Sequence, residues 1–125
     1  MASFNGFEEL ECWKKARVLR NDIKELIKSF PKNEKFELIS QMRRASRSIT
    51  HNIAEGFGRF HYQENIQFCR IARGSLYELL DQLITAFDEE YILENKYQKF
   101  RKQVFECLAI LNGYINYLKQ AKNSD

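Results

Sequence analysis

The feature that most limits the fold of this chain is an apolar stripe at helical spacing between residues 38 and 56. Its members recur at steps of three and four residues: Leu38, Met42, Ala45, Ile49, Ile53 and Gly56. At about 100° per residue, these side chains occupy roughly one third of the circumference of a helix. Arg43 and Arg47 then project from the opposite pole, and Arg44 lies on one flank. The segment therefore predicts a helix with one buried face and one exposed basic face.

Asn52 is the polar exception on the buried face, where it lies between Ile49 and Ile53. A buried amide without hydrogen-bond partners costs about 1 to 3 kcal/mol. We interpret Asn52 as a satisfied structural amide or as a residue that fixes the register of the helix, in preference to a ligand contact.

The rest of the chain repeats this helical pattern. A single proline and five glycines among 125 residues leave few places to break a helix. Apolar spacing and end signals predict helices at about 7–30, 34–58, 62–90 and 95–121. Pro31 ends the first helix, Asn33 is the expected N-cap of the second, and Asn95 opens the fourth.

Short connections between these helices force neighbours to lie antiparallel. The predicted fold class is therefore all-α, an antiparallel up-down-up-down four-helix bundle. Its length suits a single domain, which we place at 7–121. We expect a flexible N-terminus at 1–6 and a disordered tail at 122–125.

Some small and apolar residues lie at positions that the core of a solitary four-helix bundle does not require. Gly74 and Ala54 point outward by the helical angle, and small residues on an outer face let another backbone approach closely. The fourth helix carries a second apolar row beside its main one. We predict structural or subunit contacts at Asn52, Ala54, Gly74, Ile110, Tyr114 and Tyr117. For Gly74 and Ala54 the alternative is tolerated drift at surface positions.

The sequence gives little support for catalysis, and we predict neither an enzyme nor a bound metal or cofactor. His51 and His61 form no metal pair on one helix face, and neither has a Glu three residues before it as the di-iron bundles require. Ser46, Ser48 and Thr50 near His51 diverge around the helix, so they form no nucleophile and base pair.

Three widely spaced cysteines, Cys12, Cys69 and Cys107, include no CxxC and are expected to be packed thiols of a reducing compartment. No apolar run approaches the roughly 18 residues of a membrane span, and the N-terminus lacks the pattern of a signal peptide. We therefore expect a cytoplasmic protein that does not contact a membrane.

Charge is distributed unevenly, although the net charge is only +3. Between residues 43 and 73 there are six arginines and two acids, whereas residues 78–94 carry six acids and no base. Arginine suits bidentate contact with phosphate or carboxylate. The predicted nucleic-acid-binding residues are Arg43, Arg44, Arg47, Arg59, Arg70 and Arg73. Phe57, Phe60, Tyr62 and Phe68 are candidates for stacking on exposed bases.

In the predicted bundle, these arginines meet at the end that holds the turn near Phe60, and the acids gather at the other end. Two alternatives remain open: the arginines pair with acids of a neighbouring subunit or partner protein, or they are plainly solvated charge. The RNA hypothesis requires the guanidinium groups to lie together and without carboxylate partners.

The sequence resembles a known family through a string of thirteen positions. They are Gln41, Arg43, Arg44, Ala45, Ser48, Ile49, Asn52, Ile53, Ala54, Glu55, Gly56, Gly58 and Arg59. This string is similar to the hallmark of the small four-helix bundles called 23S ribosomal RNA intervening-sequence proteins. Glu11, Trp13 and the Phe30-Pro31 stop support the likeness, and His61 departs from it because a small capping residue is expected there.

The resemblance implies a bundle that assembles as a ring, a homopentamer, and that is encoded in some bacteria within insertions of ribosomal RNA genes. It extends to accessory proteins of diversity-generating retroelements, which are ring-shaped bundles that bind a reverse transcriptase and nucleic acid. It implies no catalytic activity.

We therefore hypothesise a non-enzymatic, ring-forming bundle that binds RNA or a ribonucleoprotein through its arginine-rich end. The alternative is an oligomeric protein-interaction scaffold without direct nucleic-acid contact. A third hypothesis, an enzyme with its site at a ring interface, requires a ligand held by Arg44, Asn52, Glu55 and Arg59.

Overall fold

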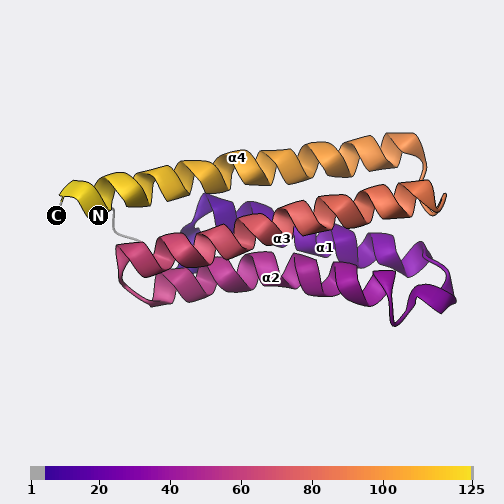
Figure 1. Ribbon diagram of the computed structural model, residues 1–125, viewed down its shortest axis with the longest axis horizontal. Coiled ribbons are helices and arrows are strands. Elements are labelled where there is room, and N and C mark those ends of the chain that lie inside the picture. Colours follow the sequence, from indigo (N-terminus) through magenta and orange to yellow (C-terminus); the bar gives the residue numbers. More distant parts are fainter. Residues whose placement is uncertain (1–4, 125) are drawn as a thin grey trace.

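The computed structural model describes residues 5–124, which form four α-helices and three short 3-10 turns (Figure 1). The helices are α1 (Glu11–Leu26), α2 (Leu38–Gly58), α3 (Tyr62–Asp88) and α4 (Glu94–Ser124). The 3-10 turns are Phe7–Glu9, Ile27–Ser29 and Lys32–Glu34. Residues 5–124 contain no strand, and the predicted all-α four-helix bundle is confirmed.

The chain turns back at each connection, so that consecutive helices lie side by side (Figure 1). Hydrogen bonds between α3 and α4 agree with this arrangement, because Asn65 pairs with Tyr114 and Arg73 pairs with Asn112. The α1–α2 and α3–α4 connections meet at one end of the bundle, where Tyr91 donates a 2.7 Å hydrogen bond to Glu34. The α2–α3 connection lies at the other end.

The beginning of the chain is less regular than the predicted helix at 7–30. Leu10 is extended, with φ −71° and ψ 129°, and separates the first 3-10 turn from α1. The predicted start of the second helix at residue 34 is wrong, because 32–34 form a 3-10 turn and α2 begins at Leu38. Asn33 therefore lies too far from α2 to cap it. The Glu34 carboxylate instead accepts a hydrogen bond of 3.3 Å from the Leu38 amide.

The later helix boundaries agree more closely. Helix α3 begins at Tyr62 as predicted, after an extended His61 that makes no side-chain cap hydrogen bond, and it ends at Asp88. The expected disordered tail is wrong for 122–124, because α4 continues to Ser124 and Lys122 donates a hydrogen bond to Gln63 of α3. Asp125 and the first four residues of the expected flexible N-terminus lie outside the described residues.

The core contains the apolar stripe that the sequence indicated in α2, and all six of its members are buried. On α3 the large apolar side chains differ in burial. Leu79 and Ala86 are buried, while Leu80 is half-buried and Phe87 is exposed. The buried arc of α3 is wider than a single row because α3 packs against both α2 and α4.

Gly56 allows α2 and α3 to approach closely. A Cβ at this position would lie 2.7 Å from Asn65 Oδ1 and 2.9 Å from Phe68 Cβ, closer than real contacts permit. Farther along the same interface, Ser75 Oγ donates a 2.9 Å hydrogen bond to Ser48 Oγ. The α2–α3 interface is the most extensive in the bundle, and the α1–α4 interface is the sparsest of the four between neighbouring helices.

The three cysteines are free and buried, so the prediction of packed thiols is confirmed. Burial raises the pKa of the Cys12 and Cys69 thiols to about 12 and that of Cys107 to about 11, because the anionic thiolate is poorly solvated in the core. No helix within residues 5–124 has the length and apolar content needed to cross a membrane.

Candidate functional site

The structure does not bring the six predicted arginines together at the turn near Phe60. Arg43, Arg44 and Arg47 lie in the first half of α2, and 16 residues of helix, or about 24 Å, separate Arg43 from Arg59. Arg73 faces α4, where its Nη1 donates a 3.0 Å hydrogen bond to Asn112 Oδ1. The predicted single cluster is therefore wrong, because a stretch of sequence that is rich in arginine winds around two helices.

Three of the six arginines nevertheless share one site, a groove along the outer side of α1 and α2. We call this site the basic groove, and its volume is about 810 Å³. Its lining residues come from the first 3-10 turn and both helices: Phe7, Trp13, Arg20, Asn21, Lys24, Ile27, Arg43, Arg44, Ser46, Arg47, Ser48, Thr50, His51 and Ala54. Among these described residues there are five Lys or Arg side chains and no Asp or Glu.

The cations of the basic groove are held in two ways. Arg20 is half-buried in the wall, and its Nη1 donates a 3.2 Å hydrogen bond to Thr50 Oγ1 across the two helices. Arg43, Arg44 and Arg47 are exposed, and within residues 5–124 no carboxylate lies in ion-pair distance of any of them. The groove therefore presents one half-buried and three exposed arginines whose positive charge the described chain does not neutralise.

The N-terminal end of α1 adds aromatic surface to the basic groove. The rings of Phe7 and Trp13 meet edge to face with centroids 5.1 Å apart. The Arg17 guanidinium lies 5.7 Å from the centroid of the Trp13 ring. Such an arrangement offers both a π surface and a cation to a ligand.

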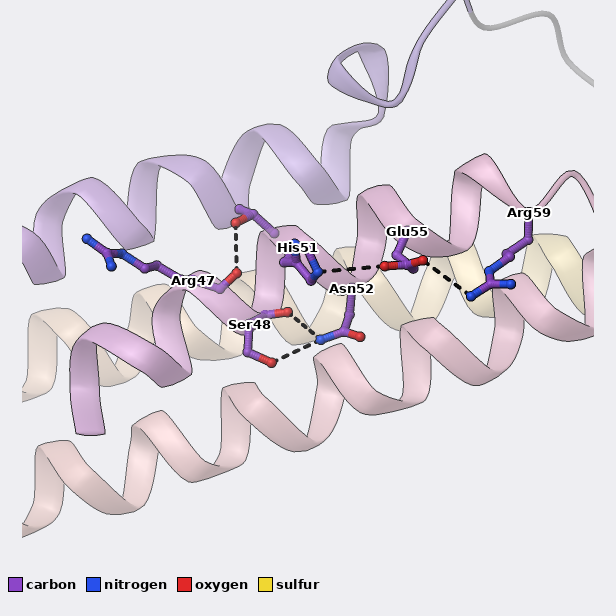
Figure 2. A network of polar contacts seen from close by, with 7 residues as sticks. Arg47, Ser48, His51, Asn52, Glu55 and Arg59 are labelled. Atoms are coloured by element: carbon purple, nitrogen blue, oxygen red, sulfur yellow. Dashed lines mark hydrogen bonds and ion pairs between the residues drawn. The ribbon is translucent and has the colours of Figure 1, made fainter. Parts of the chain in front are cut away.

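Farther along α2, polar side chains in a row pair with one another or with the backbone of the same helix (Figure 2). Asn52 Nδ2 donates to the carbonyl oxygen of Ser48 at 2.8 Å and to Ser48 Oγ at 3.0 Å. Glu55 lies between His51 and Arg59, with Oε1 at 3.6 Å from His51 Nε2 and Oε2 at 3.3 Å from Arg59 Nη2. Figure 2 shows Arg47 and Arg59 at opposite ends of this row.

This row does not assemble the ligand site of the third hypothesis. Asn52 is satisfied within its own helix, Glu55 is paired with Arg59, and Arg44 lines the basic groove instead. Glu55 and Arg59 line a smaller hollow beside the groove, of about 320 Å³, together with His51, Ala54 and Gly58.

The two predicted α3 arginines lie away from the basic groove. Arg70 is exposed, and about 60° of rotation around the helix separates it from Arg73. Gly74 is also exposed, and a Cβ added there would meet no heavy atom within 4 Å. The outward position expected for Gly74 is thus observed, whereas Ala54 is half-buried and lines the groove.

The aromatics predicted for base stacking surround the α2–α3 turn. The Phe57 and Phe60 rings are 6.2 Å apart, and the Arg59 guanidinium covers Phe68 at 5.0 Å from its centroid. Phe60 is 85% exposed and has φ 54°, a left-handed backbone that non-glycine residues rarely adopt. Tyr62 is half-buried against the core.

Both walls of the basic groove lie within the part of the chain that matches a known family. Residues 8–113 match the family model described as 23S rRNA-intervening sequence protein. The chain belongs to the 23S rRNA-intervening sequence protein family.

One solved structure is similar to this family member over most of its length. It is the crystal structure of a protein with unknown function from the S23 ribosomal protein family of Bacteroides thetaiotaomicron. The two chains are 24% identical, and the match covers 84% of this chain and 95% of that one with a TM-score of 0.77. At this identity the likeness shows the fold alone. No curated protein matches the chain.

In this member of the 23S rRNA-intervening sequence protein family, the second apolar row of α4 packs against the bundle. Ile110, Tyr114 and Tyr117 are half-buried against the core. The Tyr114 hydroxyl accepts a 3.0 Å hydrogen bond from Asn65 Nδ2, and its ring stacks with Tyr117 at 6.2 Å. Tyr114 thus has a role within the chain, and a contact of α4 with a second subunit stays a prediction.

Sequence reasoning missed the α1 side of the groove. Arg20 and Lys24 stand more than 18 residues before Arg43, outside the dense run of arginines that indicated the basic face of α2. A signal was present: Arg17, Arg20 and Lys24 recur at steps of three and four residues, which places them on one face of the first helix.

Proposed function

We propose that this protein is a non-enzymatic RNA-binding bundle that holds RNA in the basic groove between α1 and α2. The observation that carries the proposal is the presence of five Lys or Arg side chains in one groove without any carboxylate among its described lining residues. Phosphate contacts supply most of the affinity of nucleic-acid binding, and they come chiefly from such cations. The six arginines do not lie together at the Phe60 end, and Arg59 pairs with Glu55, so the sequence hypothesis fails in that form. The proposal rests instead on the three α2 arginines that share the groove with Arg20 and Lys24.

The arrangement of charge supports a ligand in this groove. Arg43 and Arg47 stand four residues apart on α2, and like charges at this spacing repel each other by a few tenths of a kcal/mol. An anion in the groove relieves that repulsion. The description of the family, which refers to 23S rRNA, makes RNA the proposed anion in preference to an acidic peptide.

The proposal includes no catalysis and no cofactor. The buried thiols have raised pKa values, which disfavour the nucleophilic thiolate. Among the described residues, no three His, Cys, Asp or Glu side chains are grouped as a metal site requires. The free thiols suit a reducing compartment, and we propose a cytoplasmic location.

Filter binding to structured ribosomal RNA at low salt tests the proposal. We expect the Arg43→Ala, Arg47→Ala double variant to lose about tenfold or more in affinity, and we expect wild-type affinity to fall steeply as salt rises. The matched control, Arg70→Ala with Lys119→Ala, removes two exposed cations outside the groove and should retain affinity within about twofold. Absence of wild-type binding, or equal losses in both double variants, would reject RNA binding in the groove.

The second candidate function is an oligomeric scaffold in which a neighbouring copy supplies carboxylates to the groove. It is favoured by the acidic run at residues 78–94 and by the open surface at Gly74. The ring and its five subunits rest on the family resemblance. Light scattering separates the candidates, since a scaffold predicts that the Arg43→Ala, Arg47→Ala variant becomes monomeric, whereas RNA binding predicts an unchanged assembly with weakened affinity.

A further inference from the structure

The basic groove has a shape that distinguishes between kinds of RNA. We infer that it accepts a single strand and excludes a duplex, with phosphates over the arginine end and a base against Trp13. This inference rests on the proposed function, because it names the class of RNA that the groove takes. Width, depth and the order of groups along the groove each support it.

The width of the groove is set by two neighbouring helices. Packed helices lie about 8 to 10 Å apart between their axes. A whole α-helix, about 10 to 12 Å across, fits inside the major groove of a DNA duplex, so a duplex is wider than one helix. The furrow that the two packed helices form on their outer side is therefore narrower than a double helix, which can only lie across its rim. A single sugar-phosphate strand is narrow enough to enter.

The depth of the groove adds groups that a duplex on the rim does not reach. Arg20 is half-buried and is fixed by its 3.2 Å hydrogen bond to Thr50, while Ser46 and Thr50 are buried. The hydroxyls of Ser46 and Thr50 donate to the backbone carbonyls of Arg43 and Arg47, at 3.0 and 3.2 Å, so their protons are already used within α2. The guanidinium of Arg20 is then the inner donor available to a phosphate.

The order of groups along the groove suits a single strand, with aromatic rings at one end and cations at the other. The α1 wall from Trp13 to Ile27 spans 14 residues, or about 21 Å of helix. Lys24 and Arg43 lie near the Ile27 end of this wall, and Phe7 lies at the Trp13 end. Bases stack on aromatic side chains while their phosphates follow a basic track, and this is the usual design of single-strand binding sites.

Trp13 provides a direct test, because it is the only tryptophan in the chain and lies in the groove. The wild-type protein is titrated at low salt with three probes: an oligouridylate of about ten nucleotides, a blunt RNA duplex of the same length, and inorganic polyphosphate. Tryptophan emission reports occupation of the groove, and the anisotropy of labelled RNA reports binding anywhere on the protein.

We expect the oligouridylate to quench Trp13 and to bind about tenfold or more tightly than the duplex. The Arg43→Ala, Arg47→Ala variant should lose the quenching in parallel with affinity, and the Arg70→Ala, Lys119→Ala control should keep both. If the duplex binds as tightly as the single strand, or if the single strand binds without changing Trp13 emission, RNA binding stands and this inference is rejected.

Two further outcomes would also reject the inference that a single strand occupies the groove. Equal quenching by polyphosphate and oligouridylate would show that no base contacts Trp13, which overturns the inference while leaving a polyanion groove. Absence of binding by either RNA would reject the proposed function together with the inference. Because the decisive readouts use the wild-type chain, a variant that fails to fold does not prevent a conclusion.

Discussion

On its side towards α3, helix α2 buries Gly56 against Asn65 and Phe68, whereas on its side towards α1 it leaves Arg43 and Arg47 exposed without carboxylate partners. The inner side joins its polar groups in pairs, as in the hydrogen bond from Ser75 to Ser48. The outer side instead concentrates cations in a groove. One helix thus combines a closed interface with an open one.

This difference separates residues that stabilise the bundle from residues that are available to a ligand. Changes in the closed interior should alter the free energy of unfolding, because its atoms have no room to relax. Changes in the basic groove should alter affinity and leave stability nearly constant. Substitutions and pH changes on each side of α2 test that division.

Alkaline pH should weaken the interior most, through the three buried thiols. A thiol with its usual pKa of 9.0 in the unfolded chain binds its proton more tightly in the core, where the pKa values are about 11 to 12. The stability from these neutral thiols is therefore fully present below about pH 9 and is lost as pH rises through about 11 to 12.

Urea unfolding between pH 8 and pH 10.5 measures this loss, at about 1.4 kcal/mol per pKa unit for each thiol. The Cys107→Ala variant should show a shallower pH dependence than the wild type. An identical dependence in that variant would mean that other groups cause the alkaline loss.

The Gly56→Ala substitution should lower the free energy of unfolding by about 1 to 3 kcal/mol, because the new methyl group overpacks the α2–α3 interface. Chemical denaturation measures the loss. Gly74→Ala is the matched control, since Gly74 is also helical but faces open space, and it should gain up to about 1 kcal/mol from helix propensity. Equal effects in the two variants would contradict the close approach at Gly56.

The Tyr114→Phe substitution should cost about 0.5 to 1.5 kcal/mol, because the amide of Asn65 loses its acceptor 3.0 Å away. Urea unfolding measures this loss of stability. Tyr77→Phe is the control, because Tyr77 is exposed on α3 and its hydroxyl can bond to water. A neutral Tyr114→Phe variant would show that the hydrogen bond to Asn65 contributes nothing.

The smallest change is expected in the groove itself. Replacing Arg47 by Ala removes an i, i+4 repulsion with Arg43, so the free energy of unfolding should rise by about 0.2 to 0.5 kcal/mol. Urea unfolding without RNA measures it, with Arg70→Ala as the control for losing one exposed arginine. A decrease of more than about 1 kcal/mol in the free energy of unfolding would show that Arg47 stabilises the bundle. It would contradict the assignment of the α1 side of α2 to ligand binding alone.

The sequence predicted most of the fold because apolar periodicity controls helix formation. The stripe from Leu38 to Gly56 is buried as expected, and the exit of the chain from α2 before Tyr62 was indicated correctly. The start of α2 was predicted wrongly because the Leu38 amide donates its hydrogen bond to the Glu34 carboxylate and not to the side chain of Asn33. The geometry of the 3-10 turn determines which of the two side chains reaches the Leu38 amide. Apolar periodicity does not predict that geometry.

The candidate site was harder to predict because its two walls come from different helices. Arginines close in sequence, such as Arg47 and Arg59, lie far apart along α2 (Figure 2). Arg20 reaches the same groove as Arg47 from α1, through a contact with Thr50 across 30 positions of sequence. Counting charge along the chain therefore located the basic helix but not the groove.

The extensive pairing of α2 with α3 has a consequence for how the molecule opens. These two helices are joined by a short turn, so their contacts are local in sequence and inexpensive to form early in folding. Helices α1 and α4 share only a sparse interface. The last amide protons to exchange with solvent should accordingly belong to the central hairpin, and the first helix should detach while that hairpin persists.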